Sequence, residues 1–131
     1  MKKNQFAKIV FSIAFLYDFI LGIAYLFFAK NIYDHFEVDL PNNLGYIQFP
    51  ALLILLFAFM FYQIVKAPEE NKYLMIYGIF MKLAFSAVVL LHWIQDSIPT
   101  MWKPIALFDL LFVFLFVFAY LNTQQEEGNI F

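Results

Sequence analysis

The chain has 131 residues, of which 64% are hydrophobic and 14% charged, and its formal net charge is −2. Soluble domains are about 45–50% apolar and about 25% charged, and a domain this small cannot bury so much apolar surface. Lipid is therefore expected to be part of the solvent of this protein. The sequence contains no cysteine, which excludes disulfides and thiol chemistry, and it has no basic patch suited to nucleic acid.

Four apolar stretches have about the 20 residues that a helix needs to cross roughly 30 Å of hydrocarbon. They cover approximately residues 6–28, 47–65, 73–94 and 105–121. Backbone groups cannot remain unpaired in lipid, so these stretches are predicted to be helices. Pro50 and Pro104 are expected in or just before a first helical turn, where no backbone donor is lost. We predict an all-α membrane protein, a four-helix bundle formed by a single four-span domain over residues 1–131.

The longest connection, residues 29–46, is predicted to contain a short amphipathic helix on the membrane surface. Its evidence is the recurrence of Ile32, Phe36 and Leu40 every four residues among charged side chains. If the N-terminus lies inside, most lysines lie on the cytoplasmic side, as the positive-inside rule requires. The cytoplasmic lysines would be Lys2, Lys3, Lys8, Lys66 and Lys72, and the outer ones Lys30 and Lys103. We therefore predict a multi-pass protein of the inner (plasma) membrane with both termini in the cytoplasm.

Three ionisable residues, Asp18, Lys82 and Asp109, fall well inside the predicted spans. At about 1.5 Å per helical residue, Asp18 and Lys82 each lie roughly 15 Å from the inner surface. Asp109 lies roughly 9 Å below the outer surface, within reach of a long lysine side chain. A lone charge at this depth costs several kcal/mol, so the three side chains are expected to face one another inside the bundle.

The surrounding sequence supports such a cluster. Gly78, Lys82 and Ser86 are spaced by four residues and form a small polar stripe, and Asp18 with Gly22 does the same on the first span. Two interpretations remain open: a structural ion pair that sets helix register, or a functional site that carries protons or holds the polar group of a lipophilic ligand. The candidate ligand-binding or proton-relay residues are Asp18, Lys82, Asp109, Ser86, Tyr17 and Tyr77.

Cofactor sites have weaker support in the sequence. His35 and His92 both fall near the predicted outer surface and are candidate ligands for a metal or haem, but no metal-ligand spacing accompanies them. The phenylalanines of the last span are candidates to line a pocket for a flat ligand such as a quinone, although they occupy more than one helix face. They are Phe108, Phe112, Phe114, Phe116 and Phe118. No nucleophile–base arrangement or phosphate loop is evident, so catalysis is not predicted.

Short motifs in three spans resemble those of the DoxX-like four-helix bacterial membrane proteins. These motifs are Tyr17-Asp18 with Gly22, Gly78 with Lys82, and Asp109-Leu110-Leu111. The resemblance implies a four-helix bundle and a loose association with membrane oxidoreductase complexes and quinone chemistry. The cysteines that a thiol-linked member would use are absent here.

Three functional hypotheses follow. The chain is a binding or transport module for a small amphipathic ligand or proton, an accessory subunit of a larger membrane complex, or a quinone- or haem-linked oxidoreductase component. Because four helices are expected to enclose only a narrow interior, a homodimer would be the simplest way to form a larger pocket.

Overall fold

The structure is a computed structural model in which residues 4–124 are described. The described residues form five α-helices and no strands: α1 (Gln5–Phe27), α2 (Ala29–His35), α3 (Gly45–Lys66), α4 (Leu74–Ile94) and α5 (Trp102–Asn122). All of them except α2 are long and apolar enough to cross a membrane. Their ends lie within a few residues of the four predicted spans. The prediction of an all-α, multi-pass membrane protein is thus confirmed for this part of the chain.

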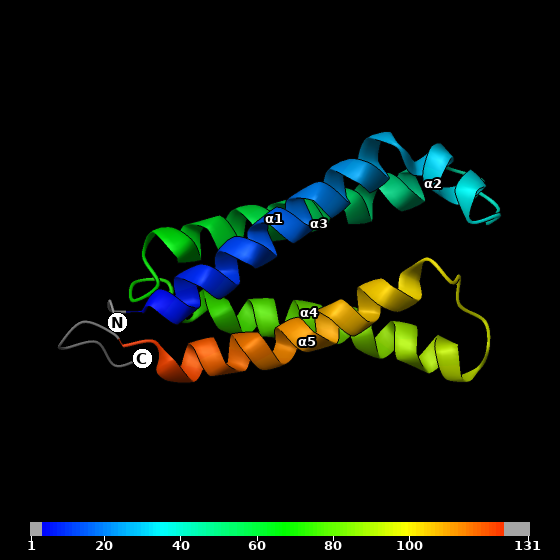
Figure 1. The fold of residues 1–131 in the computed structure, drawn as a ribbon. Coiled ribbons are helices and arrows are strands. Elements are labelled where there is room, and N and C mark those ends of the chain that lie inside the picture. Colours follow the sequence, from blue (N-terminus) through cyan, green and yellow to red (C-terminus); the bar gives the residue numbers. More distant parts are fainter. Residues whose placement is uncertain (1–3, 125–131) are drawn as a thin grey trace.

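The four long helices form two antiparallel pairs (Figure 1). Helix α1 packs along α3, and α4 packs along α5. The two pairs meet at the end of the bundle where α1 begins and α5 ends, which we call the terminal end. They diverge toward the opposite end, where α2 and the α4–α5 loop lie, which we call the α2 end.

Each long helix buries one narrow stripe and exposes the rest of its surface. On α1 the buried residues recur every three or four positions, from Ala7 through Phe11 and Ala14 to Asp18 and Gly22, which places them on one face of the helix. Large apolar side chains cover the other faces, and lipid is the solvent that can accommodate them.

The terminal half of the bundle is closed by aromatic packing. The rings of Phe11 and Phe116 stack with their centroids 4.4 Å apart, and Phe61 contacts both from α3. A Cβ added at Gly78 would lie 2.8 Å from the Phe61 ring. Glycine at this position therefore lets α4 approach the aromatic core, as the small-residue stripe predicted.

Hydrogen bonds join three segments at the terminal end. The Asn4 amide donates to Glu69 Oε2 at 3.2 Å and to the Gln124 carbonyl at 3.1 Å, and Asn4 Oδ1 accepts from the Gln124 N–H at 2.8 Å. The start of α1, the α3–α4 turn and the segment after α5 are thereby held together.

A short helix, α2, is present in the predicted connection, but the extent and the buried face expected for it are wrong. Helix α2 ends at His35, because Glu37 adopts a left-handed φ of 56° and the Val38 N–H bonds back to the Tyr33 carbonyl. This is the six-to-one hydrogen bond of a Schellman ending. The buried side of α2 carries Ala29 and Tyr33, whereas Phe36 and Leu40 lie beyond the helix and remain exposed.

The prediction for Pro50 is also wrong, whereas Pro104 lies in the first turn of α5 as expected. Helix α3 begins at Gly45, so Pro50 falls in its second turn. Proline has no N–H to offer the Tyr46 carbonyl one turn earlier, which weakens the helix there.

Candidate functional site

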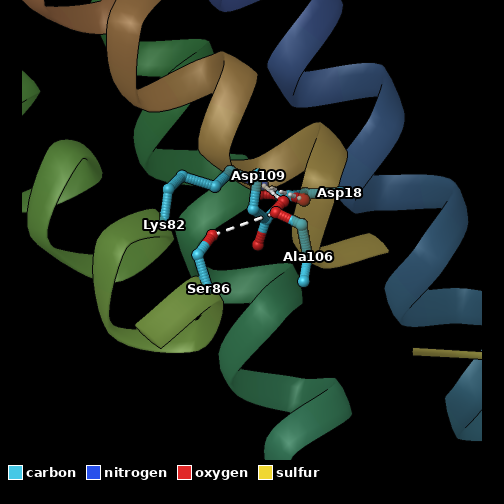
Figure 2. A network of polar contacts seen from close by, with 5 residues as sticks. All are labelled: Asp18, Lys82, Ser86, Ala106 and Asp109. Atoms are coloured by element: carbon cyan, nitrogen blue, oxygen red, sulfur yellow. Dashed lines mark hydrogen bonds and ion pairs between the residues drawn. The ribbon is translucent and has the colours of Figure 1, made fainter. Parts of the chain in front are cut away.

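Lys82 lies between two carboxylates in the middle of the bundle (Figure 2). Its Nζ donates to Asp18 Oδ1 at 2.7 Å and to Asp109 Oδ1 at 3.0 Å. The three side chains come from α4, α1 and α5, and all are at most 5% exposed. The predicted cluster of one cation and two acids is confirmed, and we call these residues the charge triad.

Ser86 supports the triad without joining it. Its hydroxyl donates to the Ala106 carbonyl of α5 at 3.1 Å, one turn before Asp109 (Figure 2). Ser86 lies one helical turn after Lys82, so this bond sets the register of α4 against α5 at the level of the triad. The predicted small polar stripe is therefore buried, and its hydroxyl has a positioning role.

Aromatic faces surround the Lys82 ammonium. Its Nζ lies 5.0 Å from the ring centroid of Phe112, 5.3 Å from that of Tyr17 and 5.9 Å from that of Phe61. Cation–π attraction replaces part of the lost hydration. Tyr17 thus contributes its ring to the site, whereas Tyr77 is 58% exposed and lies on the outer face of α4.

The triad contains one more acidic group than basic groups. Asp18 is 1% exposed, and its Oδ2 is a buried side-chain oxygen that accepts no hydrogen bond from any residue between 4 and 124. A buried carboxylate oxygen without a partner is energetically costly. Protonation would turn the same group into a hydrogen-bond donor, and a cation placed beside it would compensate its charge.

A cavity of about 590 Å³ lies on the α2 side of the triad, between the two helix pairs. Asp18 and Asp109 form its deep end, and apolar side chains of α3 and α4, including Phe57, Met81 and Phe85, form its walls. Pockets of this volume hold small organic molecules. The expectation that one chain encloses only a narrow interior is therefore wrong, because the pairs diverge toward the α2 end.

Aromatic and acidic side chains form the mouth of the cavity at the α2 end. They are Tyr33 of α2, Asp39 of the α2–α3 connection, Tyr46 at the start of α3 and Trp102 at the start of α5. Burial raises the pKa of Tyr33, so its phenol stays neutral. Nothing in the periodicity of the sequence distinguished Asp39 from the other loop acids, so the mouth was not predicted.

The remaining sequence candidates lie away from the cavity. His35 ends α2 with its ring edge-on to Phe36, and His92 lies in the last turn of α4, where its Nδ1 is 3.4 Å from the Ser97 hydroxyl. Among residues 4–124, no group of three or more His, Asp or Glu side chains is arranged to hold a metal ion.

The phenylalanines of α5 do not line the cavity either. Phe112 and Phe116 are buried in the aromatic core, while Phe108, Phe114 and Phe118 are more than half exposed. The aromatic walls come instead from Phe57 and Phe85 on α3 and α4.

Comparisons of the chain with protein-family models, with curated proteins and with solved structures found no match. The resemblance to DoxX-like proteins consequently stays a prediction from short motifs.

Proposed function

We propose that this protein binds a small amphipathic molecule in the cavity between its two helix pairs. The apolar body of the ligand would lie against the walls formed by α3 and α4, and its polar group would reach Asp18 and Asp109. The observation that carries the proposal is the unpartnered Asp18 Oδ2, which belongs to a buried carboxyl at the deep end of an apolar cavity.

The lining supports binding or transport rather than covalent catalysis. The residues that line the cavity are mostly aliphatic and aromatic, and those described include no Ser, Thr or His. Such walls hold a lipophilic body, and a few convergent polar groups orient it. A nucleophile with an adjacent base, which acyl or phosphoryl transfer would need, is not available from these lining residues.

Native mass spectrometry of the gently solubilised protein tests this proposal. We expect one small lipophilic molecule to remain bound to each chain and to dissociate on collisional activation. A heavier hetero-assembly without such a molecule would favour the accessory-subunit hypothesis, and a visible absorption band would favour a haem-linked role.

A cavity-filling variant makes the test specific. Leu53→Trp combined with Met81→Trp adds bulk at two residues that line the cavity, one on α3 and one on α4, and should abolish ligand retention. The matched control is Leu56→Trp with Leu83→Trp, which adds the same side chains to the same two helices at exposed positions outside the lining. Equal retention by both variants would place the ligand elsewhere and refute the proposal.

A further inference from the structure

We propose that the ligand is a lipophilic monocation and that its binding displaces one proton from the Asp18–Asp109 carboxyl pair. The inference rests on the proposed function and specifies the ligand class of the same site. It follows from the charge of the triad, the position of the unpartnered oxygen and the chemistry of the cavity mouth.

The triad contains two acidic groups and one basic group. Lys82 donates to both carboxyls at 2.7 and 3.0 Å, so one ammonium serves two acids. With all three groups ionised, the triad carries one net negative charge in a place remote from water, which is strongly unfavourable. One further positive charge neutralises it. In the empty site that charge is one proton held by one of the two carboxyls, whose ionisations are coupled through Lys82.

The extra positive charge needs a carboxyl oxygen that Lys82 does not occupy. The Oδ1 atoms of Asp18 and Asp109 are both occupied by Lys82. Asp18 Oδ2 has no partner among residues 4–124, and Asp18 lines the cavity. A cation that enters the cavity therefore comes beside the Asp18 carboxyl, whose Oδ2 has less than 1 Å² of accessible surface and can contact the ligand once the side chain rotates.

A ligand would reach the triad through the mouth of the cavity. Asp39 and the rings of Tyr33, Tyr46 and Trp102 surround the mouth, and no Lys or His side chain is among the lining residues. Aromatic faces attract organic cations, and an acidic rim raises the local concentration of positively charged solutes. The mouth and the deep end of the cavity thus both favour positively charged ligands.

The titratable groups that line the cavity or contact the triad come from every adjoining element. They are Tyr17 and Tyr25 of α1, Tyr33 of α2, Asp39 of the connection, Tyr46 of α3, Lys82 of α4 and Asp109 of α5. A phenol ordinarily keeps its proton near pH 7, since its usual pKa is about 10, and Asp39 is exposed at the mouth. Proton release on binding is therefore assigned to the Asp18–Asp109 pair.

The exchange is balanced without a co-reactant. The O–H bond of the protonated carboxyl breaks, the proton passes to water at the mouth, and the resulting carboxylate pairs with the incoming cation. No electrons are transferred. The total charge inside the bundle is the same before and after binding.

Isothermal titration calorimetry on the intact protein in nanodiscs tests the inference with two probes. Methyltriphenylphosphonium is a permanent lipophilic monocation, and triphenylphosphine oxide is a neutral molecule of similar shape. Because neither probe titrates near neutral pH, any proton released comes from the protein. We expect at least tenfold tighter binding of the cation and release of about one proton per cation, measured from the heats in two buffers with different ionisation enthalpies. In the pH range in which the carboxyl pair holds its proton, cation binding releases that proton. The affinity for the cation should therefore rise by up to about tenfold per unit increase in pH.

The variant Asp18→Asn tests whether Asp18 is the site of the exchange. The amide keeps an oxygen to accept from Lys82 but cannot ionise, so proton release should vanish and cation affinity should fall to that of the neutral probe. Asp34→Asn is the matched control, because Asp34 is an exposed acid of α2 outside the lining, and it should behave as wild type. The two-buffer measurement on wild type stands even if Asp18→Asn fails to fold.

The outcomes separate this inference from the proposed function. Equal affinity for the two probes without proton release would overturn the cation–proton exchange and leave a neutral-ligand site standing. Absence of binding by either probe would overturn both. Proton release that persists in a folded Asp18→Asn protein would assign the exchange to another group and refute the inference.

Discussion

Removal of the Lys82 ammonium should destabilise the bundle strongly, because it leaves two buried carboxyls facing each other. At an effective dielectric constant of about 20, the ammonium and an ionised carboxylate whose atoms are 2.7 to 3.0 Å apart attract by about 6 kcal/mol before desolvation is subtracted. Truncating one partner of a buried ion pair costs about 3–5 kcal/mol in practice. We therefore expect Lys82→Met to lower the free energy of unfolding by about 3–5 kcal/mol near pH 7. Protonation of the stranded carboxyls at lower pH should return part of that loss.

The measurement is SDS-induced unfolding of the protein in mixed micelles, followed by circular dichroism. The decisive comparison is Lys82→Met together with Asp18→Leu and Asp109→Leu, which removes all three charges. Replacing a whole buried ion cluster with apolar side chains is often neutral or stabilising, so this variant should recover to within about 1 kcal/mol of wild type. If Lys82→Met alone is as stable as wild type, or if the triple variant is no more stable than the single one, the ammonium does not compensate the carboxyls and the reasoning fails.

Three further predictions address packing and topology. Gly78→Ala should cost about 1–3 kcal/mol, because the added Cβ would lie 2.8 Å from the Phe61 ring; an unchanged SDS midpoint would show that the ring moves aside freely. Phe116→Ala empties a fully buried position of the aromatic core and should cost about 2 kcal/mol or more, whereas Phe118→Ala, at a side chain that is 58% exposed, should stay within about 0.5 kcal/mol of wild type in the same titration. Because the chain has no cysteine, Glu70→Cys and Ser97→Cys each give a single thiol; a membrane-impermeant maleimide added to intact cells should label only Ser97→Cys, and the reverse pattern would invert the proposed topology.

The membrane-spanning helices and the charge triad were predictable because both follow from the cost of placing polar groups in lipid. Unpaired backbone groups are excluded from the hydrocarbon, which sets the type and length of each span. Isolated charges are also strongly disfavoured in the hydrocarbon. Asp18, Lys82 and Asp109 were therefore expected to pair with one another. The depth of each residue, calculated from a rise of about 1.5 Å per helical residue, was enough to predict that the three side chains can contact one another.

The details of the connections were less accessible. The four-residue spacing of Ile32, Phe36 and Leu40 indicated a longer amphipathic helix than the one observed. Its end depends on a left-handed Glu37 and a single backbone hydrogen bond from Val38 to Tyr33, which residue periodicity does not encode. Pro50 was misplaced for the same reason, since the first residue of α3 depends on capping contacts around Gly45.

The sequence by itself therefore established that lipid surrounds the protein, that there are four spans and that buried charges are paired. Each of these follows from the free energy of transferring individual side chains and backbone groups from water into lipid. The tertiary structure decided that the helices associate as two pairs which meet through Phe11, Phe61 and Phe116 and separate on the α2 side of the triad. That divergence leaves the cavity of about 590 Å³ open onto Asp18 and Asp109. It depends on how ring shapes and small residues from distant segments fit together, which is a property of packing between helices rather than of any one stretch of sequence.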